Sequence, residues 1–100
     1  MNPATRRRVM FRFRLYVAGD TENSARAVSN LNALCEAHLP QRYEIEIVDV
    51  FREPKRALTD GILMTPTLVK LAPSPILRIV GTLSETQPVL QALGLESLIA

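Results

Sequence analysis

The residues of this chain that could carry out chemistry are few, and their spacing keeps them apart. The single cysteine, Cys35, and the single histidine, His38, are three residues apart near the end of one predicted helix. A metal site needs three or four converging Cys, His or carboxylate ligands, so this pair predicts no metal. A lone cysteine also excludes an internal disulfide and is compatible with a reducing compartment.

Nucleophilic catalysis would need a base beside a hydroxyl or thiol nucleophile. The candidate hydroxyls, Thr21 and Ser24, begin the helix that His38 ends, about 20 Å away at ~1.5 Å per residue. The four glycines are scattered singly and form no phosphate-binding loop. We therefore expect no catalytic residue and no cofactor.

Length and composition predict one globular domain. The chain has 100 residues, 47% of them hydrophobic and 22% charged, with a net charge of +2. We expect a single domain over residues 1–100, in which residues 1–8 form a disordered basic arm. No apolar run approaches the ~18 to 20 residues of a membrane helix, and the N-terminal residues lack the apolar segment of a signal peptide, so we expect a cytoplasmic protein.

The first half of the chain alternates between strand and helix patterns. Residues 9–18 have one apolar and one basic side, which predicts a strand. Asp20 or Thr21 can cap the helix that follows, which runs to about residue 38. Residues 43–51 predict a second strand, whose nearly continuous apolar end indicates cover on both faces. The predicted inward stripe of the helix is Val28, Leu31, Leu34, Cys35 and Leu39.

The second half predicts a short helix over residues 55–62 and then an antiparallel hairpin. Residues 67–80 form the two strands of this hairpin around the turn APSP. Lys70 and Arg78 are the charges that we expect to point outward from it.

The last predicted helix lies within residues 83–99, where Ser84 and Gln87 fit a capping box that Pro88 weakens. The element order is strand, helix, strand, helix, strand, strand, helix. A parallel crossover followed by a hairpin in one sheet predicts an α/β protein with the thioredoxin-like fold. The corner after the first strand, where thioredoxins carry a C-x-x-C pair, holds only polar residues here.

Basic residues allow a nucleic-acid alternative. A phosphate-facing stripe could be formed by Arg6, Arg7, Arg8, Arg12, Arg14, Arg26, Lys70 and Arg78. The strands lack the aromatic stacking pattern of RNA-binding sheets, because Phe11 and Phe13 share the predicted core face. A solvated basic face or an acidic protein partner is therefore favoured over nucleic acid.

The chain resembles the KaiB family in four segments that occur in the family's order and spacing: LYVAGDTENSARAVSNL, IVDVFREP, ILMTPTLVK and PSPILRIVGTLS. The resemblance spans residues 13–93. It implies a non-catalytic protein that docks on the clock ATPase KaiC in a circadian or timing and stress-response system. In cyanobacterial clocks such proteins sequester KaiA and compete with the kinase SasA.

The resemblance also implies two folds, one thioredoxin-like and one with a rearranged second half that assembles as a homo-oligomer, a dimer or tetramer. Local conflicts of the kind that two balanced packings would produce occur at Pro66, Pro73, Pro75 and Pro88, although prolines also punctuate ordinary loops. Such folds coexist only when their free energies differ by a few kcal/mol.

Partner-binding roles for Arg26, Lys70 and Arg78 are implied by the resemblance, and the reading of each as an ordinary solvated charge stays open. Glu46 and Gly61 stand where clock members often have lysines, which puts KaiA sequestration in doubt.

The last predicted helix also departs from the family's sequence pattern, since KaiB sequences commonly read Gly-Leu-Asp where this chain has Ala92, Leu93 and Gly94. Alanine favours a helix over glycine by about 1 kcal/mol, and Gly94 can serve as a left-handed cap, so we expect a larger thioredoxin-like population.

The alternative function is a thioredoxin-fold redox enzyme that uses Cys35 through a mixed disulfide, although a reactive cysteine should sit at the start of the helix.

Overall fold

The computed structural model describes residues 9–95 of the chain. The basic arm predicted over residues 1–8 lies outside the described residues, as do residues 96–99 of the last predicted helix. The described elements are β1 (Phe11–Val17), α2 (Glu22–His38), β2 (Tyr43–Asp49), α3 (Pro54–Thr59), β3 (Thr67–Ala72), β4 (Leu77–Val80) and α4 (Thr86–Leu93). Their order confirms the predicted one.

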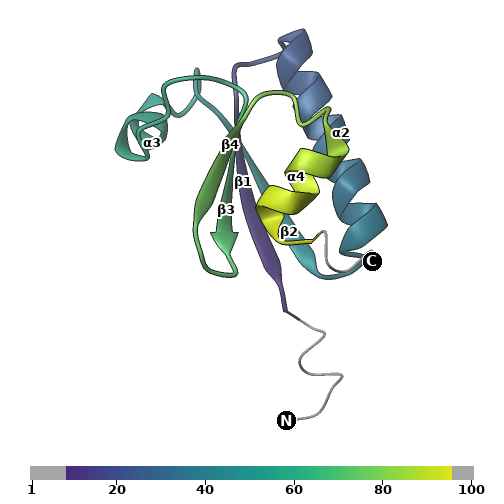
Figure 1. Cartoon of the computed structure of the whole chain (residues 1–100). Coiled ribbons are helices and arrows are strands. Elements are labelled where there is room, and N and C mark those ends of the chain that lie inside the picture. Colours follow the sequence, from purple (N-terminus) through teal and green to yellow (C-terminus); the bar gives the residue numbers. More distant parts are fainter. Residues whose placement is uncertain (1–8, 96–100) are drawn as a thin grey trace.

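The strands form one mixed sheet in the order β2-β1-β3-β4. The β1 and β2 strands are parallel, as the crossover through α2 requires, and β3 runs antiparallel to both β1 and β4. Figure 1 shows α2 and α4 together on one side of the sheet and the short α3 on the other. The predicted α/β architecture with a parallel crossover and a hairpin is therefore confirmed.

Polar residues after β1 start α2 as predicted. Thr21 is the N-cap, and its hydroxyl accepts a hydrogen bond of 3.3 Å from the backbone N–H of Ser24. Glu22 places a carboxylate at the positive end of the helix dipole. The helix ends at His38, just before Pro40, which cannot continue it.

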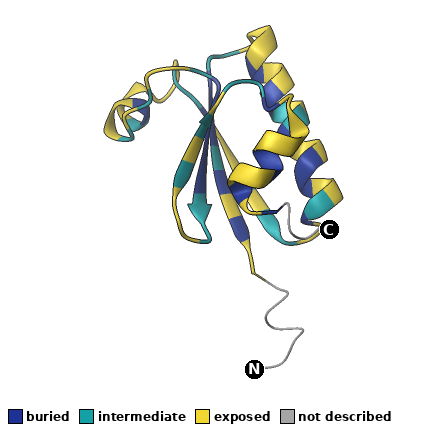
Figure 2. Cartoon of the chain, viewed as in Figure 1, coloured by how far each residue is buried: buried dark blue, intermediate teal, exposed yellow. Residues whose placement is uncertain are grey.

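The main hydrophobic core lies between the sheet and the pair α2 and α4. Phe13 and Leu15 of β1, Leu31 of α2, Leu68 of β3 and Leu90 of α4 are all buried in it. The predicted stripe of α2 is confirmed, with four members buried and one packed against them: Leu31, Leu34, Cys35, Leu39 and Val28. Figure 2 shows the outer surfaces of both helices exposed and their inner surfaces buried.

The predicted cover of β2 on both faces is confirmed in part, because Tyr43 and Ile45 pack against the main core and Val48 is buried with Tyr16 and Val69 on the α3 side. Only Val48 of its residues is buried, and Ile47 is 44% exposed. The strand pairs with β1 alone among the described residues. Its apolar run therefore supplies residues to both faces, while its place at the edge of the sheet leaves Ile47 half exposed.

Lys70 is buried, contrary to the prediction that it points outward, and only 4% of it is exposed. Alternation along β3 places Lys70 on the same face as Leu68, which belongs to the main core. Its ammonium nitrogen lies 6.0 Å from the centroid of the Phe11 ring, a cation–π arrangement that favours the charge there. The hairpin pattern alone does not reveal that a helix-covered face reaches this position.

The capping box predicted at Ser84 is wrong, because α4 begins at Thr86 and its N-cap, Glu85, makes no side-chain cap bond. Pro88 sits in the first turn, where a missing N–H costs no helical hydrogen bond. Gly94 ends the helix in the left-handed conformation, at a φ of 76°, so the predicted cap is confirmed.

Three of the four prolines singled out in the second half lie at the ends of β3. The peptide bonds that precede Pro66, Pro73 and Pro75 are all cis. Pro66 comes directly before β3, and Pro73 and Pro75 belong to the turn between β3 and β4.

Candidate partner-binding surface

The corner between β1 and α2 uses its polar atoms to hold the local backbone. The Ser24 hydroxyl accepts a hydrogen bond from the Ala18 N–H at 3.0 Å and another from the Thr21 hydroxyl at 2.8 Å. Asp49, at the end of β2, accepts hydrogen bonds from the N–H groups of Gly19 and Phe51 at 3.2 and 2.9 Å. These bonds connect the ends of the two parallel strands at one corner.

Phe51 covers this corner from the outside. A Cβ on Gly19 would lie 3.4 Å from the Phe51 ring, and Gly19 has a φ of 57°, so glycine suits both the contact and the backbone. Phe51 itself stays 73% exposed. The corner that carries the C-x-x-C pair in thioredoxins here holds the capping residues Thr21 and Ser24, and the Phe51 ring covers it at Gly19.

Cys35 lies far from this corner, in the last turn of α2 and inside the main core. Burial, followed by the charge of Glu36, raises the pKa of its thiol to about 12. Such a thiol carries almost no thiolate at neutral pH and is therefore a poor nucleophile. Within residues 9–95, no three His, Cys, Asp or Glu side chains gather in a way that could hold a metal ion.

A chain of ion pairs links α3 to the sheet. Arg56 of α3 binds both carboxylate oxygens of Glu46 on β2 at 2.9 Å, and Arg14 of β1 binds the same carboxylate at 2.8 Å. Hydrogen bonds from Arg56 first and Arg14 second lower the pKa of Glu46 to about 2. Arg56 also contacts Glu53, the N-cap of α3, at 3.3 Å.

The residues that follow α3 are held by a second set of polar contacts. The buried Tyr16 hydroxyl donates a hydrogen bond to Asp60, and Arg14 reaches the same carboxylate oxygen at 3.2 Å. Burial raises the pKa of Tyr16, and its hydrogen bond lowers the pKa of Asp60. Arg78 of β4 donates to the carbonyls of Asp60 and Gly61.

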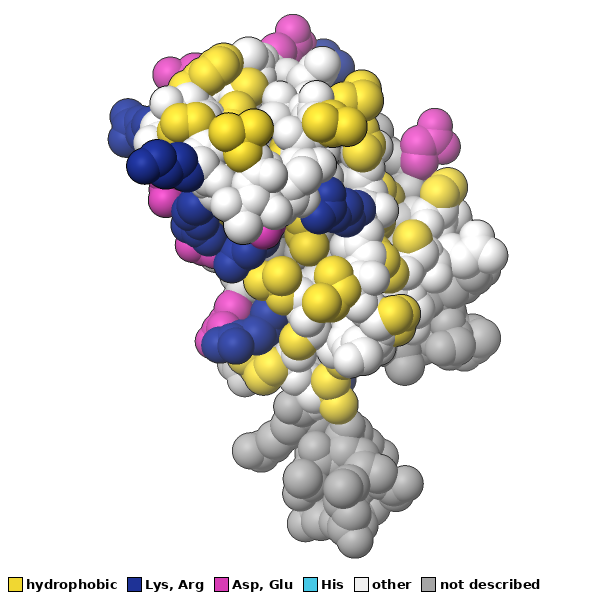
Figure 3. Space-filling model, turned by 90° about the vertical axis from the view of Figure 1, so that its left-hand side faces the viewer, with side chains coloured by type: hydrophobic (Ala, Val, Ile, Leu, Met, Phe, Trp, Pro, Cys, Tyr) yellow, Lys and Arg dark blue, Asp and Glu magenta, His cyan; other side chains and the backbone are white. Residues whose placement is uncertain are grey.

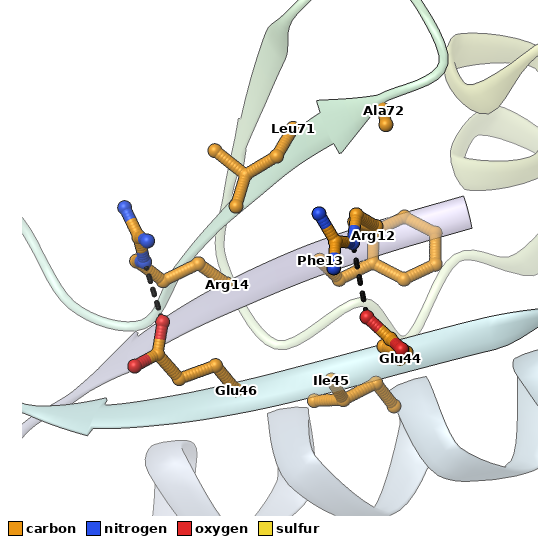
Figure 4. A pocket seen from close by; sticks show the side chains of 8 residues that line it. All are labelled: Arg12, Phe13, Arg14, Glu44, Ile45, Glu46, Leu71 and Ala72. Carbon is orange, nitrogen blue, oxygen red and sulfur yellow. Dashed lines mark hydrogen bonds and ion pairs between the residues drawn. The ribbon is translucent and has the colours of Figure 1, made fainter. Parts of the chain in front are cut away.

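A similar Arg–Glu pair lies nearby on the sheet but does not reach α3. Arg12 and Glu44 are neighbours in the β1–β2 register, and their side chains meet at 3.0 Å. Figure 4 shows this pair and the Arg14–Glu46 pair side by side above the shallow hollow that they line. Each drawn Arg faces a Glu, so the charges of the hollow are already balanced.

Exposed apolar side chains gather around α3. We define the α3 surface as Phe51, Leu58, Leu63 and Met64. Leu63 is 95% exposed, and the basic residues Arg52 and Lys55 stand exposed beside the apolar group. Figure 3 views this side of the molecule and shows hydrophobic side chains in its upper part with Lys and Arg next to them. Exposed apolar groups with a charged border are typical of a protein-binding surface.

The three basic residues predicted to bind a partner do not converge. Arg26 is exposed on α2 and forms an ion pair of 2.6 Å with Glu22. Lys70 lies in the core, as described above. Arg78 is exposed on the α3 side of the sheet, because its neighbours Leu77 and Ile79 pack against the main core. Only Arg78 adjoins the α3 surface, through its contacts with Asp60 and Gly61.

Sequence reasoning missed the α3 surface. Part of the signal was present, since Leu58 falls in residues 55–62, where the helical periodicity is weak, and apolar residues without periodicity have no single face to bury. The charged network was also missed, because Arg14 and Glu46 meet only through the strand pairing.

Comparisons with known proteins agree on family and fold. A family model described as the KaiB domain matches residues 14–95. The circadian clock protein KaiB3 of Synechocystis is 42% identical over 83% of this chain and 79% of its own length. The circadian clock oscillator protein KaiB of Cyanothece is 44% identical over 82% of this chain and 78% of its own.

Solved structures with similar folds are thioredoxin-like. Chloroplastic thioredoxin z matches with a TM-score of 0.72 and 21% identity, over 94% of this chain and 85% of its own. The N-terminal domain of Synechococcus elongatus SasA matches with a TM-score of 0.67 and 20% identity, over 84% and 80%. The predicted thioredoxin-like fold is therefore confirmed. No helix within residues 9–95 has the length and apolar character needed to cross a membrane.

We predict that Glu46→Gln destabilises the protein at pH 7 and that the loss fades in acid. The lowered pKa of Glu46 means that its contribution is complete above the ordinary value of 4.5 and disappears as the pH falls toward about 2. Because the side chain is partly exposed, the loss at pH 7 should be about 1 kcal/mol or less. Urea unfolding at pH 7, 5 and 3 measures it.

The matched control is Glu44→Gln, which removes the same kind of strand pair without touching α3. Amide hydrogen exchange in residues 54–60 should speed up in Glu46→Gln and stay unchanged in the control. Equal effects of the two substitutions on α3 would contradict the assignment of Glu46 as its anchor.

We predict that Cys35 reacts slowly with a thiol reagent in the native protein at pH 7, because its thiol is buried and its pKa is raised. The same reagent should react quickly in urea, which provides the control. Complete modification of the folded protein within minutes would instead support the redox alternative.

Proposed function

The chain belongs to the KaiB family, and on that premise we propose that it is a non-catalytic regulatory protein that binds a KaiC-type ATPase. The system that it serves is a circadian clock or a timing and stress-response pathway. The α3 surface is the observation that carries the proposal. A strongly exposed apolar group beside basic residues suits a protein partner better than a small substrate.

The absence of catalysis in this proposal is supported by how the chemical groups are used. The hydroxyls of Thr21 and Ser24 cap α2 and hold the corner. The thiol of Cys35 is buried with a raised pKa. The alternative of a thioredoxin-fold redox enzyme would have to use a thiol at the wrong end of the helix.

Exposed basic residues are proposed to favour an acidic partner surface. Arg78 and Arg26 are exposed and are proposed to speed encounter with an acidic surface of the ATPase. Lys70 is reassigned, since a buried ammonium over Phe11 supports the core rather than a rim contact. A SasA-like kinase is proposed as a competitor because its N-terminal domain shares this fold.

KaiA is the weaker partner in this proposal. Glu46 stands where clock members often have lysine, and its carboxylate is already bound by Arg14 and Arg56. A carboxylate that is already bound within the chain is a poor contact for a KaiA-type partner whose surface is complementary to lysine at this position.

The proposal includes a second conformation in which the end of the chain rearranges and the protein forms a homo-oligomer. In the thioredoxin-like state Ala92 is exposed within α4 and Gly94 caps it, so both residues suit the helix. We also propose that the protein is a single domain and acts in the cytoplasm.

We predict that Leu63→Ser weakens binding to the KaiC-type ATPase from the same genome at least tenfold, about 1.4 kcal/mol. Leu63 is almost fully exposed, so the substitution should leave thermal stability unchanged. Biolayer interferometry with and without nucleotide measures binding, and Ile47→Ser on the β2 edge is the matched control. Absence of a complex in every nucleotide state would overturn the proposed function.

Charge-reversal substitutions test the proposed role of the basic residues in association. Arg26→Glu with Arg78→Glu should slow association and reduce its salt dependence, while dissociation changes less. Lys70→Glu is expected to destabilise the fold itself, because it places a carboxylate in the core.

We predict that Ala92→Gly shifts the free protein away from the thioredoxin-like state. Glycine costs about 1 kcal/mol within a helix, which changes a two-state ratio by somewhat less than tenfold. Size exclusion with light scattering should show more oligomer, and NMR should show fewer molecules with α4. Unchanged oligomer size together with unchanged helix and strand assignments in residues 55–95 would contradict this role.

A further inference from the structure

The outer edge of β4 has no strand beside it among the described residues. The backbone register shows which groups face this edge. The N–H of Gly81 donates to the carbonyl of Pro66 at 2.9 Å, so residues 66 and 81 form a hydrogen-bonded pair. Hydrogen-bonded pairs alternate in an antiparallel ladder, so the backbone N–H and C=O groups of Arg78 and Val80 point away from β3.

Hollows lie on both faces of the sheet beside this edge. On the α3 face, a hollow is lined by Ile62, Leu63, Met64, Thr67, Arg78 and Val80. On the helix face, another is lined by Ile79, Val80, Thr82, Leu83, Ser84, Glu85, Pro88 and Val89. Side chains of an added strand would point alternately to the two faces, so each hollow would receive every second one.

The edge is protected only by the shortness of β4, which has four residues, and by one charge. Natural edge strands are blunted by short length, charges, prolines or bulges. The charge on β4 is Arg78, and its guanidinium is turned to the carbonyls of Asp60 and Gly61. Val80 is 56% exposed and Ile76 is also exposed, so the strand presents apolar side chains. Figure 3 shows hydrophobic side chains in the middle and lower part of this side of the molecule.

Charge decides which occupant fits. Two copies of the chain that paired through β4 about a two-fold axis would bring their Arg78 side chains to the same face, directly opposite or on a diagonal of ~7–8 Å. Like charges at that spacing oppose pairing. A segment from another protein can instead place a carboxylate near Arg78.

We propose that the edge of β4 binds an extended, acidic-apolar segment of a partner protein by strand addition. The backbone of Arg78 and Val80 supplies the hydrogen bonds, and the two hollows take alternate side chains. This site uses the thioredoxin-like fold but does not depend on the identity of the ATPase proposed above. It can therefore fail or hold independently of that function.

The probe is the peptide acetyl-Thr-Val-Asp-Val-Thr-Val-Thr-amide, titrated into the full-length protein and followed by NMR. We expect saturable shifts of the Arg78 and Val80 amides, with hydrogen exchange at both slowed at least tenfold. Val80→Pro removes one outward N–H without breaking a β3–β4 hydrogen bond, and it should weaken binding at least tenfold. Val80→Ala keeps the N–H and is the matched control, which should retain the exchange protection.

A second test leaves the protein unchanged. One peptide is N-methylated at its valines and another at its threonines and aspartate, so each has one blocked edge. At least one of the two should bind, because successive N–H groups of a strand point to opposite edges and each peptide keeps one open edge. Binding by neither peptide, or shifts confined to Tyr43–Asp49, would overturn the proposal. Protection of Arg78 and Val80 in a dimer of the protein alone would also overturn it.

Discussion

The structure depends on the burial of β1 on both of its faces. Leu15 points into the core under α2 and α4, while its neighbour Tyr16 points into a smaller core under α3, and both are completely buried. β1 also pairs with β2 on one side and with β3 on the other. The seven residues of β1 therefore contribute to both cores and to both halves of the sheet.

The two cores differ in what holds their covering helices. The inner surfaces of α2 and α4 carry rows of leucine, so hydrophobic burial fixes them. Ala57 is the buried residue of α3, and the small core beneath it is Tyr16, Val48, Ala57 and Val69. Polar contacts to Glu46 and Asp60 supply the rest of its attachment. A helix held this way responds to pH and salt more than one held by leucine.

Element order, the α2 cap and the apolar stripe could be predicted because each depends on residues close in sequence. The burial of Lys70 and the exposure of Ile47 could not, because both depend on which strands are neighbours. The same limit applies to the candidate site: Arg78 was found as a surface charge, but its contact with Gly61 joins residues far apart in the chain. Periodicity describes one element at a time, and a surface is made by several.

Arg78 connects the two surfaces on the α3 side of the molecule. Its side chain holds the carbonyls after α3, which positions the exposed Leu63 and Met64, and its backbone faces the open edge of β4. The loop from Gly61 to Met64 therefore forms both the border of the α3 surface and one wall of the hollow beside β4. A partner that moves this loop must act on both places, because one guanidinium fixes the loop to the strand. The thioredoxin-like scaffold here holds this loop at the end of the sheet where β1 ends and β3 begins.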